Sequence, residues 1–283
     1  MRVLVVQNEA DDPPGRLGDW LTDAGVELDV REGPDLPANL HEHAGLIVLG
    51  GAMNAYEDDV APWFPHLRAL LRAAVAAEVP TLGICAGAQV LAVAMGGRVE
   101  VNEDGPESGA YLIAKRAAAA TDPLFGPLPI TPDVIQWHYD AVTVLPPGAM
   151  QLASSPLCTN QAYRLGRLAW GIQFHIETTP EIVRAWADAD AEQLEDYDLD
   201  LIMRQVEAID DDIVEVWQPF AERFAAIVLD PSSVRAARGV PTTTAEPITD
   251  PAAIRAALAA EAHAAQSSRT SLPMPQWQPP DRG

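Results

Sequence analysis

Residues 81–89 have the sequence TLGICAGAQ: an apolar run, a Gly-x-Cys-x-Gly turn and the start of an Ala- and Leu-rich segment. This order predicts a strand, a sharp turn and a helix. Gly83 and Gly87 let the chain bend tightly and leave room for a substrate beside Cys85. Free N–H groups at the start of the helix favour the thiolate form of the sulfur. The stretch therefore predicts a nucleophile mounted at a strand-to-helix turn of an α/β fold.

Short apolar runs alternate with segments of helical period on the amino-terminal side of this stretch. The runs at 2–6, 45–49 and 80–84 are continuously apolar, as is typical of parallel strands buried on both faces. Segments 15–24 and 63–77 carry apolar residues at helical spacing. They are predicted to be the crossover helices of a parallel sheet flanked by helices.

The chain changes character after residue 95. Short strand-like pieces separated by Pro and Gly predict mixed or antiparallel pairing; they lie at 96–99, 110–114, 134–137, 141–145 and 151–153. Residues 168–174 form the last strong strand, and a long helical extension runs from Pro180 to Leu229. Residues 1–229 are predicted to be one domain. Residues 230–283 are predicted to be a Pro- and Ala-rich tail with one short helix near 252–265.

The composition narrows the class of partner and compartment. Asp and Glu number 41 against 18 Lys and Arg, a net charge of −23, which repels nucleic acid and anionic membrane surfaces. No apolar run approaches the roughly 18 residues that a membrane span needs. Two distant cysteines, Cys85 and Cys158, suggest neither a metal site nor a disulfide framework, so we expect a cytoplasmic protein. Cys158 lacks flanking glycines and a helix N-terminus, so we expect it to be structural. The acidic blocks at 188–200 and 210–212 are interpreted as solvated helix faces in preference to a cation site.

A second motif, QFHIE at 173–177, supplies partners for the cysteine. Cys85 alone fits an apolar filler equally well, His175 alone fits a core histidine, and Glu177 alone fits a surface charge. Together, at the ends of two strands of one sheet, they fit a nucleophile, a base and a group that orients the base. Alternation along a strand predicts that His175 and Glu177 share one face.

A glycine turn follows the strand at 45–49. If that strand neighbours the one before Cys85, the N–H groups of Gly51 and Ala86 form a pair of donors for an oxyanion. The structural alternative is an ordinary tight turn.

In sequence order, the motifs LGG at 49–51, GICAGAQ at 83–89, QWHYD at 136–140 and FHIE at 174–177 resemble those of class I glutamine amidotransferases, including the glutaminase domain of GMP synthase. The resemblance covers residues 1–229 and implies a three-layer, flavodoxin-like fold with a mostly parallel central sheet. It also implies a Cys85–His175–Glu177 triad that forms a γ-glutamyl thioester, with no cofactor. Gln89, Trp137, His138 and Tyr139 are implied as substrate-binding residues.

Three positions depart from the pattern of the family. Ile176 stands where Pro is usual, Tyr139 replaces a Gly beside the pocket, and Ala86 replaces a common Leu. None of these changes removes a catalytic group, but Tyr139 changes the room available to the substrate.

Three functions remain open. The first is a glutaminase that passes ammonia to a separate synthetase, since the chain has no Gly-rich phosphate loop of its own. The second is a stand-alone hydrolase of γ-glutamyl amides or conjugates. The third is a non-catalytic regulatory or binding protein whose triad is idle.

Overall fold

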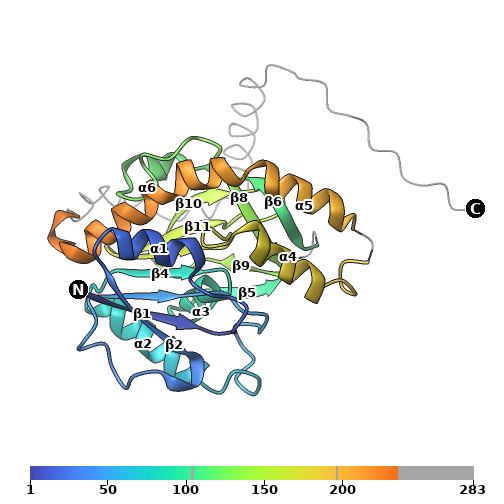
Figure 1. The fold of residues 1–283 in the computed structure, drawn as a ribbon. Helices are drawn as coiled ribbons and strands as arrows, with labels where there is room; N and C mark the ends of the chain where they lie inside the picture. The colour runs from blue at the N-terminus through green and yellow to red at the C-terminus, as the bar shows by residue number, and fades with distance from the viewer. Residues whose placement is uncertain (103–104, 196, 235–283) are drawn as a thin grey trace, which may run out of the picture. The chain divides into compact units, whose positions relative to one another are not determined.

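An eight-stranded sheet forms the centre of the molecule, seen in a computed structural model that describes residues 1–102, 105–195 and 197–234 (Figure 1). Its first five strands are parallel and its last three antiparallel. In spatial order they are β2 (Glu27–Glu32), β1 (Arg2–Gln7), β3 (Gly45–Val48), β4 (Thr81–Ile84), β12 (Ala169–Ile172), β11 (Ala162–Leu165), β10 (Met150–Ser154) and β7 (Ala114–Lys115). The predicted mostly parallel sheet is confirmed.

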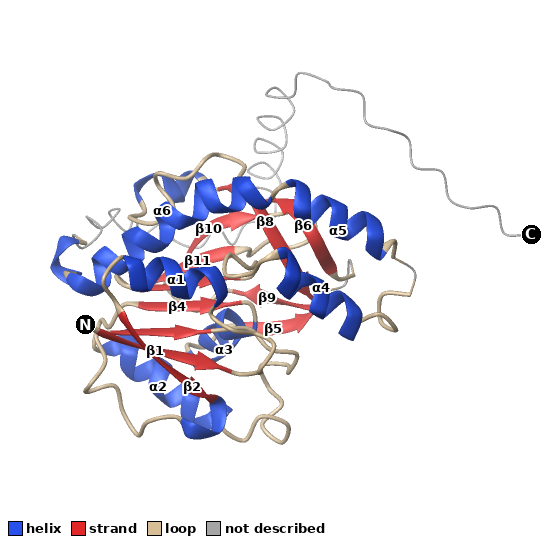
Figure 2. Ribbon diagram, viewed as in Figure 1, coloured by secondary structure: helices blue, strands red, loops and turns tan. Residues whose placement is uncertain are grey.

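Helices cover both faces of this sheet, which gives three layers (Figure 2). Alternation along β1 sends Val3 and Val5 into one core cluster, and Leu4 and Val6 into the other. The first cluster includes residues of α1 (Gly15–Asp23) and α6 (Asp210–Leu229), and the second includes residues of α2 (Phe64–Ala76) and α3 (Ala86–Ala94). The predicted crossover helices are thus present on opposite faces.

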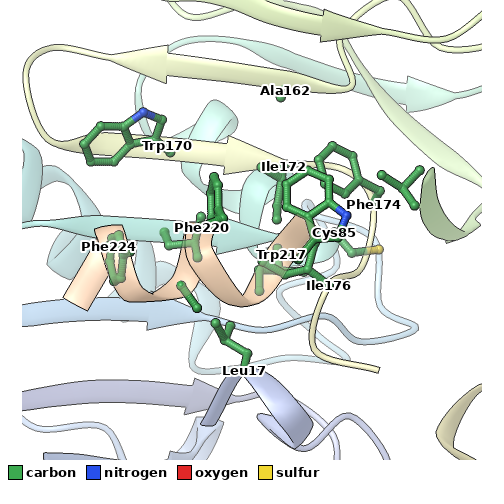
Figure 3. Packing of buried hydrophobic residues seen from close by; sticks show 14 of the residues in the cluster. Leu17, Cys85, Ala162, Trp170, Ile172, Phe174, Ile176, Trp217, Phe220 and Phe224 are labelled. Carbon is green, nitrogen blue, oxygen red and sulfur yellow. The ribbon is translucent and has the colours of Figure 1, made fainter. Parts of the chain in front are cut away.

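Aromatic side chains of α6 fill the layer beneath β12 (Figure 3). The ring of Trp217 lies 5.0 Å from that of Phe174, and the ring of Phe224 lies 6.4 Å from that of Trp170. The sulfur of Cys85 lies at the end of this cluster (Figure 3). The C-terminal helical extension therefore anchors the strand that leads to the site.

The second half of the chain adds two small antiparallel sheets, as predicted. One pairs β5 (Arg98–Val101) with β9 (Asp140–Val144), and the other pairs β6 (Glu107–Leu112) with β8 (Asp133–His138). Strands β2 and β11 were not predicted. β2 is a half-exposed edge strand with the charged sequence ELDVRE, so it lacks an apolar run. β11 is only four residues long.

The predicted helical region is divided into three helices, α4 (Pro180–Ala189), α5 (Leu199–Ala208) and α6. Thr179 caps α4 and Asp198 caps α5 through side-chain oxygens that accept from backbone N–H groups. Three 3-10 turns complete the elements: η1 (Gly33–Asp35), η2 (Ala117–Thr121) and η3 (Pro231–Ser233). Within the described ranges, none of the helices is long and apolar enough to cross a membrane. The predicted tail, apart from residues 230–234, lies outside the described residues.

Candidate active site

Cys85 occupies the turn between β4 and α3, as the sequence predicts. Its backbone has φ 50° and ψ −114°, a conformation that a side-chain-bearing residue adopts only at a cost. A Cβ on Gly87 would lie 2.1 Å from the Val48 carbonyl oxygen, and one on Gly83 would lie 2.7 Å from that of Gly87. Glycine at both positions therefore lets α3 start directly against the sheet and holds the thiol at its carboxyl edge.

His175 reaches the same edge because β12 pairs in parallel with β4, with Ile172 opposite Ile84. The strand ends at Ile172, two residues before the predicted end, so His175 lies beyond it. There the His175 N–H donates to the Ile135 carbonyl at 2.8 Å, an isolated antiparallel bridge. This bridge to β8 therefore sets the position of His175, which lies beyond the regular alternation of β12.

Glu177 holds the imidazole of His175 from one side. Nδ1 of His175 lies 2.6 Å from Oε1 of Glu177. The second carboxylate oxygen accepts the N–H of Ile176 at 2.9 Å. A proline, which is usual at this position in the family that the motifs resemble, has no N–H to donate. The Ile176 departure thus adds a hydrogen bond that orients the carboxylate.

The charge on His175 is set by competing effects. Burial of the ring disfavours the imidazolium, but the negative charges of the Glu177 carboxylate and of an ionised Cys85 sulfur outweigh it and raise the pKa of His175 well above its ordinary value. In the described part of the chain, the buried Nε2 of His175 has no hydrogen-bond partner. With Nδ1 engaged by Glu177, Nε2 is the atom available to exchange a proton with the sulfur or a substrate.

A cavity of about 440 Å³ opens at this edge, a volume in the range typical of small-molecule sites. Of the nine predicted site residues, eight line it, and Glu177 lies behind His175. The lining residues are Glu9, Asp11, Asp12, Gly51, Ala52, Met53, Cys85, Ala86, Gln89, Trp137, His138, Tyr139, Asp140, His175, Trp186, Ala189, Asp190 and Gln193.

Two residues of the cavity lining, Gly51 and Ala86, were predicted to supply backbone N–H groups to an oxyanion. Gly51 follows the end of β3, and Ala86 is the first residue of α3. Neither N–H donates a hydrogen bond to another described residue. Since β3 pairs with β4, the two donors flank the cysteine from neighbouring strand ends.

Gln89 and His138 are tied into the protein. Gln89 donates to the Asp140 carbonyl at 3.0 Å and to Oε1 of Gln173 at 3.1 Å, so only its amide oxygen remains for a substrate. Both ring nitrogens of His138 are engaged, Nδ1 by the Asp140 carbonyl and Nε2 by the buried carboxylate of Glu107. The side chain of His138 therefore shapes the β8–β9 turn.

Trp137 and Tyr139 are joined to α4 through Asp190. The indole N–H of Trp137 donates to Oδ2 of Asp190 at 2.8 Å, and the Tyr139 hydroxyl donates to the same atom at 3.4 Å. Burial, with the Asp190 carboxylate, raises the pKa of Tyr139 to about 12. Tyr139 thus lines the cavity with a partly exposed side chain. Asp190 has hydrogen-bond partners within the protein, although its acidic block was predicted to be a solvated helix face.

Sequence reasoning missed the contribution of the β1–α1 loop. Glu9, Asp11 and Asp12 line the cavity from this loop, and Trp186 of α4 packs its ring 4.7 Å from that of His175. The loop follows the carboxyl end of a parallel strand, where α/β folds place ligands, and that position was the available clue. Burial raises the pKa of Asp12 to about 7; His175 opposes this shift, and Glu177 adds to it.

Cys158 lies elsewhere. It is buried, and burial together with the Glu107 carboxylate raises the pKa of its thiol to about 12. A thiol that stays protonated is a poor nucleophile. Across the described ranges, no cluster of three or more His, Cys, Asp or Glu side chains is arranged to hold a metal ion.

Comparison with known proteins places the chain in a family. The sequence model of the family "Glutamine amidotransferase class-I" matches residues 19–184. The chain is 30% identical over 202 residues to the glutamine amidotransferase-like protein YfeJ of Salmonella typhimurium, spanning 69% of this chain and 84% of that protein. It is 33% identical over 156 residues to one subunit of the glutamine-hydrolysing GMP synthase of Halobacterium salinarum, spanning 54% of this chain and 76% of that relative.

A solved structure agrees. The crystal structure of a glutamine amidotransferase from Methylobacillus flagellatus aligns with a TM-score of 0.71 at 30% sequence identity, over 83% of this chain and 96% of that chain. Its fold is the mostly parallel, helix-flanked sheet described above. The chain belongs to the class I glutamine amidotransferase family.

Proposed function

We propose that the chain hydrolyses the side-chain amide of glutamine through a γ-glutamyl thioester on Cys85. The observation that carries the proposal is the state of His175. Its Nδ1 is held by Glu177, while its buried Nε2 has no partner within the described residues and faces the same cavity as the thiol. An imidazole fixed on one side and free on the other is the arrangement that general acid–base catalysis requires.

The steps follow from these positions. His175 takes the thiol proton, and the Cys85 sulfur attacks the amide carbon of the substrate. The carbonyl oxygen becomes an oxyanion between the N–H groups of Gly51 and Ala86, an interaction worth about 3–4 kcal/mol per donor in comparable sites. The C–N bond breaks as Nε2 of His175 returns the proton to the nitrogen, which leaves as ammonia.

Water completes the cycle. His175, again neutral, removes a proton from a water molecule that attacks the thioester carbon. The C–S bond breaks, the thiol is regenerated and glutamate leaves. Throughout, Glu177 stabilises the imidazolium without taking a proton.

We further propose that a separate synthetase accepts the ammonia. The similarity to one subunit of a glutamine-hydrolysing GMP synthase supports this proposal. We disfavour an idle, non-catalytic triad because Glu177 holds the ring of His175, and because Cys85, His175, Gly51 and Ala86 all line one cavity.

The test is ammonia release from glutamine by the purified chain, together with labelling by a glutamine analogue that carries an electrophile in place of the amide. We expect the label on Cys85 and none on Cys158. Release that begins only when a synthetase is added supports transfer to a partner. Absence of both ammonia and label, with or without a partner, rejects the proposed chemistry.

A further inference from the structure

The cavity has an acidic wall with no fixed counter-charge from Lys or Arg. Five carboxylates line it, and the described lining contains neither of these two residue types. The five are Glu9, Asp11, Asp12, Asp140 and Asp190. None of them lies within ion-pair distance of an arginine or lysine in the described part of the chain.

Three of these carboxylates have hydrogen-bond donors within the protein. Glu9 accepts the N–H of Ala52, Asp140 accepts from the Asn54 amide at 2.6 Å, and Asp190 accepts from Trp137. They are therefore part of the scaffold of the cavity. Their charges contribute to its field, but their positions have an internal explanation.

The Asp12 carboxylate differs from these three, because no donor within the described residues holds it. Its residue is only 8% exposed, and among the described residues no hydrogen bond or ion pair reaches its carboxylate. The charge of His175 favours the ionised form of this carboxylate, but burial outweighs it. A cation that enters the cavity therefore gains a partner that has no hydrogen-bond donor of its own.

The position of Asp12 indicates which part of a substrate it meets. A Cβ placed on Gly50 would lie 2.9 Å from Oδ2 of Asp12 and 3.2 Å from Cε1 of His175. The carboxylate and the imidazole therefore border the same small space. In the proposed reaction, His175 protonates the departing nitrogen, and Asp12 lies close enough to His175 for their charges to interact.

We propose that Asp12 is a specificity-determining residue, and that the cavity takes γ-glutamyl amides whose amine portion carries an ammonium group. The inference rests on the thioester chemistry proposed for Cys85. The steps are unchanged: the C–S bond forms, the C–N bond breaks, and His175 supplies the proton with which the amine leaves. The distal ammonium of that amine pairs with Asp12.

The test compares three γ-glutamyl amides of matched length but different charge. The amine portions are 1,4-diaminobutane, butylamine and 4-aminobutyrate, which are positive, neutral and negative beyond the amide. At pH 8 we expect kcat/KM to fall in that order, by about tenfold from the first to the second, equivalent to about 1.4 kcal/mol. The Asp12→Asn variant should bring the ratio of the first two close to one, and Asp12→Glu should retain a preference for the cation.

Asp59→Asn is the matched control, since it removes one exposed carboxylate outside the cavity lining. Its ratio should equal that of the wild type. Equal rates on all three amides, with glutamine still hydrolysed, overturn the inference and leave the thioester chemistry standing. A cation preference that survives Asp12→Asn overturns the role of Asp12. Failure to hydrolyse any amide, glutamine included, together with no labelling of Cys85 by the electrophilic glutamine analogue, rejects the chemistry itself.

Discussion

The two sides of the cavity differ in whether their carboxylates receive hydrogen bonds from the protein itself. On the side of His175, the Glu177 carboxylate receives two hydrogen bonds from its own segment, one from the ring and one from the Ile176 N–H. On the side of the β1–α1 loop, the Asp12 carboxylate receives none from the described residues. The first side is organised before a substrate arrives, as catalysis by fixed dipoles requires. On the second side, a hydrogen-bond donor for the carboxylate has to come from a ligand.

Removal of the nucleophile should abolish turnover. Cys85→Ala is expected to lower kcat by about 10⁶-fold, because no other group can form the thioester. Ala fits the same turn, so the melting temperature should stay close to that of the wild type. Cys158→Ala is the control and should keep its activity, since that thiol lies outside the cavity lining. Substantial turnover by Cys85→Ala would contradict the assignment.

Within the organised side, the base should matter more than the group that orients it. His175→Ala is expected to approach the loss seen for Cys85→Ala, because residues that act as a unit fail together. Glu177→Gln should lose less, about 10⁴-fold in kcat against about 10⁶-fold for removal of the base, since the ring remains although its tautomer is no longer fixed by a carboxylate. Steady-state kinetics on glutamine measure both losses. The reverse ranking would exchange the two roles.

The organised side was also the side that the sequence revealed. Cys85, His175 and Glu177 lie in short motifs at strand ends, and parallel pairing brings such ends together. The predicted end of the strand was wrong, because β12 ends at Ile172 and the bridge to Ile135 positions His175. The side chains of His175 and Glu177 nevertheless meet, as expected of residues on one face.

The acidic wall was not predicted, because its parts are scattered. Glu9, Asp11 and Asp12 come from the β1–α1 loop, Asp140 from β9, and Asp190 from the end of α4. No local pattern marks an unpaired carboxylate, since burial and the absence of a donor are properties of the folded chain. The sequence around Asp190 suggested only a solvated face, although its indole and phenol partners are more than 50 positions away.

Gly15 is the first residue of α1, directly after the loop that carries Asp12, and it lies against Glu177. A substitution at Gly15 therefore tests whether the two sides of the cavity depend on each other. Its φ is +44°, and an added Cβ would lie 2.2 Å from the Glu177 carbonyl oxygen. Gly15→Ala is expected to lower the free energy of unfolding by about 3 kcal/mol and to reduce activity by displacing Glu177.

Gly25→Ala separates the two causes of that loss. Gly25 also has a positive φ, +89°, but nothing lies within 4 Å of an added Cβ. Its cost should be that of the backbone alone, about 1–2 kcal/mol, with activity unchanged. Chemical denaturation and glutamine kinetics on both variants check this. Equal losses would show that the approach of Gly15 to Glu177 does not matter.

The Asp12 carboxylate should make the free energy of unfolding depend on pH. The pKa of Asp12 is about 7 in the folded chain against an ordinary value of 3.8, so the native state binds more protons than the unfolded state between these values. Stability conferred by the neutral carboxyl is complete below about pH 4 and falls as the pH rises through 7. Asp12→Asn cannot ionise and should escape this loss.

At pH 8, Asp12→Asn should therefore be more stable than the wild type, with an upper limit of about 4 kcal/mol from a shift of about three pH units at 1.36 kcal/mol each. At pH 4 the gain should vanish, and Asp59→Asn should show no such trend. Urea denaturation at the two pH values measures the difference. A gain that is independent of pH would mean that the Asp12 carboxylate is satisfied in the free protein, and the contrast between the two sides of the cavity would then be lost.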